Sequence, residues 1–67
     1  MNISTREYIE SLIQEINPRV IRYLYNVKTL CYSICFRIDD EIKHIDNLSE
    51  VDIITLLEML RAIKYDT

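Results

Sequence analysis

The chain contains no glycine in its 67 residues, and this absence limits the turns that it can form. Tight hairpin turns need positive φ angles, which glycine adopts most readily. The segment YSICFRI, residues 32–38, is rich in β-branched and aromatic residues and is compatible with a strand. A single strand needs a neighbour to pair with, and no hairpin signal provides one. We therefore expect an all-α protein.

Size makes such a protein marginally stable. The chain is expected to form one domain, residues 1–67, and a domain of this size buries only about 60% of the surface that its unfolded chain exposes. Natural proteins in this range usually gain stability from disulfides, a bound metal or a second subunit. Each of these three sources can be weighed from the residues present.

The cysteines and the histidine are too few for a disulfide framework or a structural metal site. Cys31 and Cys35 are the only cysteines, too few for the disulfide framework of a small secreted protein. A structural zinc site needs about four ligands, and beyond the two thiols His44 is the only nitrogen ligand of the histidine type. We expect no disulfide, no metal and no cofactor, which leaves self-association as the remaining source of stability.

No targeting or membrane-spanning segment is evident. Glu7 and Glu10 lie in the N-terminal region, where a secretion signal would need a basic start and an apolar core. The most apolar window, residues 20–38, is interrupted by charged residues that include Arg22 and Arg37. It therefore lacks the run of about 20 apolar residues that crosses a membrane. We expect a soluble, cytoplasmic protein.

The sequence predicts three helices, and the first two begin at residues typical of a helix start. Ser4 followed by Glu7 fits a capping box, which predicts a first helix at residues 5–16. Pro18 disfavours helical geometry in the residue before it and is itself suited to a first helical position. No residue that breaks a helix follows for a long stretch. A second helix is therefore expected at residues 18–45.

A third helix follows another capping signal. Asn47 is suited to the left-handed conformation that ends a helix, and Ser49 with Asp52 three residues later predicts a new start. Apolar residues then recur at helical spacing, so this helix is expected at residues 50–64. Short connections favour antiparallel neighbours, and we expect a small bundle in which both terminal helices pack against the long middle one.

The middle helix would carry more apolar surface than the other two helices can cover. At about 100° per residue, one apolar stripe forms the core of the bundle and a second stripe lies roughly 120° away. The second stripe consists of Ile21, Tyr25, Tyr32 and Phe36. We expect these four residues to form the interface of a homodimer, or else the surface that binds a different protein.

Acidic residues gather near the second predicted turn. They include Asp39, Asp40, Glu41 and Asp46, in a chain with a formal net charge of −3. One interpretation is a solvated junction between two helices, with acidic groups favoured at a helix N-terminus. The other is an acidic docking patch for a basic surface of a partner. The sequence leaves both interpretations open.

Two functional classes find little support. The negative charge and the acidic, apolar third helix argue against direct nucleic-acid binding, so the five tyrosines fit a protein interface better than a base-stacking surface. No glycine-rich phosphate loop and no nucleophile with an evident base is present. Cys31 and Cys35 are interpreted as buried thiols rather than a redox pair, and His44 as a histidine near a helix end rather than a general base. We expect no enzymatic activity and no catalytic residues.

The remaining hypothesis is a small interaction protein. We expect a module that works as a homodimer and regulates or inhibits another protein by occupying its surface. Small proteins of this kind are common among the products of phages and mobile elements. A viral origin is expected on this general ground, and no residue of the chain indicates it. The alternatives are an adaptor or structural subunit of a larger assembly, and an acidic competitor for a nucleic-acid-binding site.

Overall fold

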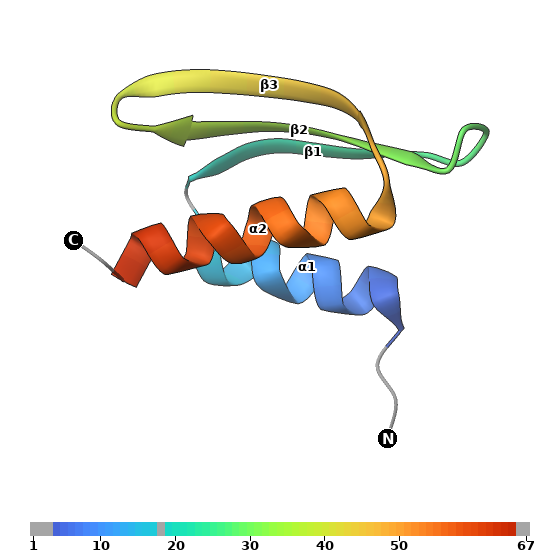
Figure 1. Cartoon of the computed structure of the whole chain (residues 1–67), viewed down its shortest axis with the longest axis horizontal. Coiled ribbons are helices and arrows are strands. Elements are labelled where there is room, and N and C mark those ends of the chain that lie inside the picture. The colour runs from blue at the N-terminus through green and yellow to red at the C-terminus, as the bar shows by residue number, and fades with distance from the viewer. Residues whose placement is uncertain (1–3, 18, 66–67) are drawn as a thin grey trace.

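The computed structural model describes residues 4–17 and 19–65, which form two helices and a three-stranded sheet (Figure 1). In chain order the elements are α1 (Thr5–Ile16), β1 (Val20–Asn26), β2 (Cys31–Ile38), β3 (Glu41–Leu48) and α2 (Glu50–Tyr65). The sheet is antiparallel with the strand order β1-β2-β3, and both helices lie on one face of it. The all-α prediction is therefore wrong, and the protein is α+β.

Both helices begin where their capping residues predict. Ser4 Oγ accepts a hydrogen bond from the Glu7 N–H at 3.2 Å, and Glu7 Oε1 accepts one from the Ser4 N–H at 3.3 Å, which completes the capping box. At the start of α2, Ser49 Oγ accepts a hydrogen bond from the Asp52 N–H at 3.2 Å. The two terminal helices are confirmed, and the second extends one residue further than predicted, to Tyr65.

The predicted middle helix is wrong, because residues 20–48 form three strands and their turns. Pro18, where that helix is predicted to start, lies outside the described residues. In β2 every second residue, Tyr32, Ile34 and Phe36, is buried. This is the period-2 burial of a strand with one face on the core. β-branched and aromatic residues favour that setting, and here it overrides the helical interpretation of the same residues.

A turn without glycine joins β2 to β3. Asp39 and Asp40 form a two-residue connection between the paired residues Ile38 and Glu41. Their φ angles are 51° and 64°. Positive φ at both central residues is the geometry of a type I′ hairpin turn, and aspartate tolerates it better than most residues do. The lack of glycine therefore did not prevent a hairpin.

The turn between β1 and β2 relies on Asn26. Its side-chain oxygen accepts hydrogen bonds from the N–H groups of Lys28 and Thr29 at 2.9 and 3.3 Å, which makes an Asx turn. Its backbone carbonyl accepts another from the Leu30 N–H at 2.8 Å, while Leu30 takes a positive φ of 59°. A leucine in this region is uncommon. The hydrogen bonds to a single asparagine thus hold a turn that includes an unfavourable backbone angle.

The core lies between the sheet and the pair of helices. In the described part of the chain, its buried apolar residues come in threes from α1, β2 and α2: Ile9, Leu12, Ile16, Tyr32, Ile34, Phe36, Ile53, Leu57 and Leu60. Burial raises the pKa of Tyr32, so its hydroxyl is harder to ionise than that of an exposed tyrosine. Beside this core, the Arg6 guanidinium of α1 lies over the Tyr25 ring of β1, 5.2 Å from the ring centroid. One face of the sheet is thus committed to packing against the helices.

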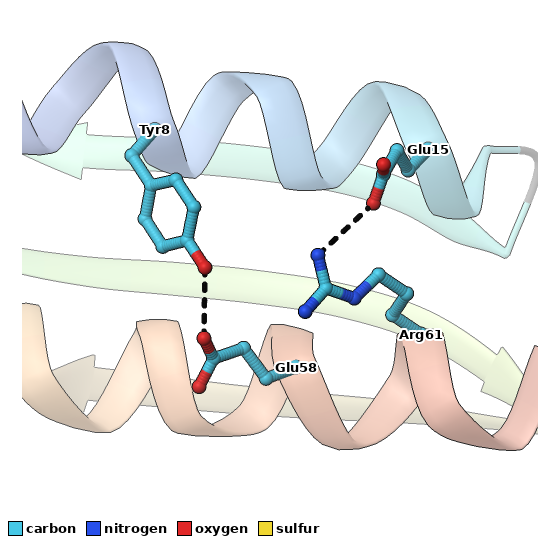
Figure 2. A network of polar contacts seen from close by, with 4 residues as sticks. All are labelled: Tyr8, Glu15, Glu58 and Arg61. Carbon is cyan, nitrogen blue, oxygen red and sulfur yellow. Dashed lines mark hydrogen bonds and ion pairs between the residues drawn. The ribbon is translucent and has the colours of Figure 1, made fainter. Parts of the chain in front are cut away.

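Two polar contacts join the helices to each other (Figure 2). The Tyr8 hydroxyl donates a hydrogen bond to Glu58 Oε2 at 2.8 Å, and Arg61 Nη1 donates one to Glu15 Oε2 at 3.3 Å. These hydrogen bonds raise the pKa of Tyr8 and the pKa of Arg61. Since the two contacts advance in the same direction along both helices, α1 and α2 run parallel.

Replacing Asp40 by valine should lower the free energy of unfolding by about 1–2 kcal/mol, because a β-branched side chain crowds the backbone in the left-handed region. Asp40→Asn is the matched control and should change stability little, since asparagine tolerates this region. Urea unfolding followed by circular dichroism measures both variants. Equal stability of the two would contradict the type I′ turn between β2 and β3.

Replacing Glu58 by glutamine should lower the pKa of Tyr8, because the carboxylate that favours the protonated hydroxyl is removed. The sign for stability follows from the raised pKa of Tyr8 in the folded state. The contact stabilises the fold below the unfolded pKa of tyrosine, about 10, and is lost as the pH rises through the folded-state pKa. An NMR titration of the Tyr8 ring signals measures the change, and an unaltered curve would rule out the hydrogen bond.

Candidate functional site

One face of the sheet is covered by α1 and α2, and the other is not (Figure 1). Residues directly opposite in an antiparallel pair project to the same side, so the strand register assigns side chains to each face. The uncovered side holds the β2 residues that alternate with the buried ones, together with their partners on β1 and β3. We name this surface the open face, and its residues are Arg22, Leu24, Asn26, Cys31, Ser33, Cys35, Arg37, Ile42, His44 and Asp46.

The open face forms a groove along β2. Small, half-buried residues of β2, including Ser33 and Cys35, make its floor, while longer side chains such as Leu24 and His44 stand on the flanking strands. The groove contains a hollow of about 250 Å³ between these residues, and a second hollow of about 510 Å³ continues it along residues 24–28. Neither hollow is enclosed. The flanking strands lie about 10 Å apart, twice the spacing of neighbouring strands.

The open face presents two cations, Arg22 and Arg37. Among the described residues, neither Arg22 nor Arg37 forms an ion pair. The carboxylate on this face, that of Asp46, is already engaged, because its Oδ1 lies 2.9 Å from His44 Nε2. Although the whole chain has a net charge of −3, this surface is therefore suited to an acidic ligand.

Exposed apolar side chains stand beside these cations. Leu24 on β1 is 52% exposed, and Ile42 on β3 is 61% exposed. Antiparallel sheets that face water usually carry polar residues on the solvated side. These two apolar side chains stand on opposite edge strands, Leu24 beside Arg22 and Ile42 opposite Arg37. The open face therefore offers both apolar and cationic contacts along the groove.

The residues of the predicted interface do not share one surface. Tyr32 and Phe36 are 2% and 5% exposed and belong to the core. Tyr25 is half-buried beside them, with its ring centroid 4.6 Å from that of Tyr32. Ile21 is half exposed at an irregularity in β1. The helix that would align the four residues does not exist, so they form no continuous strip.

The predicted acidic patch is divided between two places. Asp39, Asp40 and Glu41 are exposed together around the turn between β2 and β3. Asp46 lies on the open face, roughly 16 Å from Glu41 along β3 at the usual rise of a strand. The positive φ angles of Asp39 and Asp40 give a structural reason for those two residues. Only the turn therefore keeps a local acidic cluster.

Cys31 and Cys35 are free, half-buried thiols on the open face. Four strand residues separate them by roughly 13 Å, whereas the Cα atoms of a disulfide lie within about 7 Å. Cys35 stands opposite His44 on the neighbouring strand. Within the described residues no hydrogen bond joins that thiol to the imidazole, and Cys31 donates to the Thr29 carbonyl at 3.4 Å. The geometry thus shows no base that activates either thiol as a nucleophile.

The sequence-based interpretation missed the groove and its charged residues. The spacing of His44 and Asp46, two residues apart, puts them on one face only if the chain is extended. The alternation of small residues at positions 31, 33 and 35 with large ones at 32, 34 and 36 is the signal that could have revealed the groove. Its period of two predicts a strand whose one side is a floor of small side chains.

Comparisons with protein-family models, with curated proteins and with solved structures found no match. Neither helix in the described part of the chain is long and apolar enough to cross a membrane. Within residues 4–17 and 19–65, His, Cys, Asp and Glu side chains form no group of three that could hold a metal ion.

Replacing Ile42 by serine should change the free energy of unfolding by no more than about 0.5 kcal/mol, because its side chain is mostly exposed. Ile34→Ala, on the opposite side of the sheet, should cost about 2–5 kcal/mol, because Ile34 is 1% exposed and a cavity would remain. Urea unfolding measures both. A similar loss in the two variants would show that the open face is packed in solution.

Proposed function

We propose that the protein is a non-enzymatic interaction module, whose open face binds a segment of a partner protein that is both acidic and apolar. Binding would regulate or inhibit the partner by covering the surface to which that segment belongs. The observation that supports this proposal is the groove along β2, where the exposed Leu24 and Ile42 stand beside Arg22 and Arg37. Neither arginine forms an ion pair with another residue that the structure describes.

The shape of the groove favours a protein segment over a small molecule. Sites for small molecules usually bury 70–90% or more of their ligand in a cleft or cavity. The two hollows of the open face are instead open along the sheet and share Leu24 and Ser33. The width of about 10 Å between the flanking strands is close to the diameter of an α-helix with its side chains. A helix or an extended segment can therefore lie along β2.

The charges of the groove specify the chemistry of that segment. A guanidinium pairs best with a carboxylate, with which it can form two parallel hydrogen bonds. Arg22 and Arg37 lie on the same face, so carboxylates on the segment would face both of them. Beyond Arg22, on the side away from Arg37, an apolar side chain of the segment would contact Leu24 and enter the hollow above Ser33. Acidic residues interspersed with large apolar ones are the expected pattern.

The β2–β3 turn is the competing surface. Its exposed Asp39, Asp40 and Glu41 would attract a basic partner, as an acidic docking patch or a competitor for a nucleic-acid-binding site would. Asparagine keeps the left-handed tolerance of aspartate but carries no charge. The double variant Asp39→Asn with Asp40→Asn therefore removes two of the three negative charges of this turn and preserves its conformation. It separates the two surfaces in one experiment.

Selection of a random peptide library against the immobilised protein should enrich peptides that combine Asp or Glu with large apolar residues. The double variant Arg22→Ser with Arg37→Ser should bind these peptides at least about tenfold more weakly, because hydrogen bonds to charged groups are each worth about 1.5–3 kcal/mol. Fluorescence anisotropy measures the affinities. The Asp39→Asn, Asp40→Asn variant is the control and should bind like the wild type.

Two results would overturn the proposal. One is a consensus of basic peptides whose binding depends on the β2–β3 turn, since this would make the acidic turn the binding surface. The other is an acidic consensus whose affinity is the same for the wild type and the double arginine variant. Circular dichroism of each variant establishes that a loss of binding does not come from a loss of fold.

A further inference from the structure

The sheet has two free edges, one on β1 and one on β3. The outer edge of a terminal strand exposes backbone N–H and C=O groups that can pair with a strand of another chain. Natural proteins block such edges with charged side chains, with charges that point toward the core, or with bulges. The two edges of this sheet differ in these protective features.

The edge at β3 is protected. Its exposed side chains include Glu41, Lys43, His44 and Asp46. Lys43 stands opposite Phe36, so a charge projects from the edge toward the helix side of the sheet. The pairing is also irregular near the end of β3, where two residues oppose the single residue between Tyr32 and Ile34 of β2. A strand added here would meet charges and a bulge.

The edge at β1 lacks this protection from Tyr23 to Tyr25. Its irregularity is confined to the beginning of the strand, and pairing is regular from Arg22 to Asn26. The central run of tyrosine, leucine and tyrosine carries no charge. Exposed apolar side chains also gather along this strand and its turn, because Ile21, Leu24 and Val27 are 50%, 52% and 70% exposed. This edge therefore offers both free backbone groups and apolar contacts.

We propose that two copies of the chain associate through β1, antiparallel across a two-fold axis that passes through Leu24. In this register Leu24 faces Leu24 of the second copy, and Tyr23 faces the Tyr25 of that copy. Arg22 then faces Asn26, and no like charges meet. Aromatic and apolar cross-strand pairs of this kind stabilise antiparallel sheets.

The same register accounts for the exposed apolar residues at the ends of β1. Antiparallel continuation of the pairing brings Val27 at the turn of one copy beside Ile21 of the second copy. A two-fold axis perpendicular to the sheet keeps the helices of both copies on one side. The two sheets then become one sheet of six strands, a usual size. The groove along β2 stays open in both copies, so this inference stands apart from the proposed function.

Light scattering coupled to gel filtration tests the pairing with two variants on the same face of the sheet. The wild type should have twice the chain mass of 8.1 kDa at micromolar concentration. Leu24→Lys should have the mass of one chain, because two like charges would stand directly opposite each other. Ile42→Lys is the matched control, since Ile42 is at least as exposed as Leu24 but lies on the opposite edge strand, and it should keep the wild-type mass.

Charge complementation makes the test specific to the two-fold axis at Leu24. Leu24→Glu alone should also have the mass of one chain, and an equimolar mixture with Leu24→Lys should recover the mass of two. A wild type with the mass of one chain would overturn the proposal. So would a dimer that Ile42→Lys and Leu24→Lys dissociate alike, because the contact would then be the open face rather than the edge. Circular dichroism confirms that each variant is folded.

Discussion

The structure depends on a match in width between a pair of packed helices and a three-stranded sheet. Helices that pack together lie about 8–10 Å apart, and the outer strands of a three-stranded sheet are separated by a similar distance. The pair α1 and α2 therefore spans one face, and β2, the central strand, supplies every buried strand residue of the core. After α2 the described chain contains no further element for the second face. Among the described residues, the helix pair thus fills one face of the sheet and leaves the open face uncovered.

The terminal helices could be predicted because their signals are local. A capping serine and the residue three positions later decide where a helix starts, whatever the rest of the chain does. Ser4 with Glu7 and Ser49 with Asp52 form the hydrogen bonds that their spacing predicts. Helical spacing of apolar residues then places Ile53, Leu57 and Leu60 on one face, and all of them are buried.

The sheet could not be predicted in the same way, because its turns use residues that seldom signal a hairpin. Asp39 and Asp40 adopt the left-handed conformation that glycine usually provides, and Leu30 does so although leucine rarely does. The apolar residues of the middle segment also fit helical stripes, so periodicity alone was ambiguous. The choice between helix and strand depends on tertiary packing, because alternate residues of β2 are buried against two helices. No local sequence signal contains this information.

The same ambiguity explains why the four residues of the predicted interface do not lie on one surface of the structure. On a helix, Tyr32 and Phe36 lie one turn apart and would share a stripe with Tyr25 and Ile21. On strands, Tyr32 and Phe36 point toward the helices, where a small domain needs its largest apolar side chains. Ile21 and Tyr25 remain on β1, at the edge proposed for self-association. Two of the four residues predicted at an interface, Ile21 and Tyr25, thus lie at the proposed one. They do so because they belong to the edge strand β1, and not because they share a helical stripe.

Self-association at β1 would also determine how the grooves are presented. The two β2 strands of the proposed dimer are separated by two β1 strands, a distance of about 14 Å at the usual strand spacing. The two-fold axis places both grooves on the same face of the six-stranded sheet and makes them run in opposite directions. A partner that displays two binding segments could fill both grooves at once. The second contact would then be intramolecular, which raises affinity without any new contact between groove and segment.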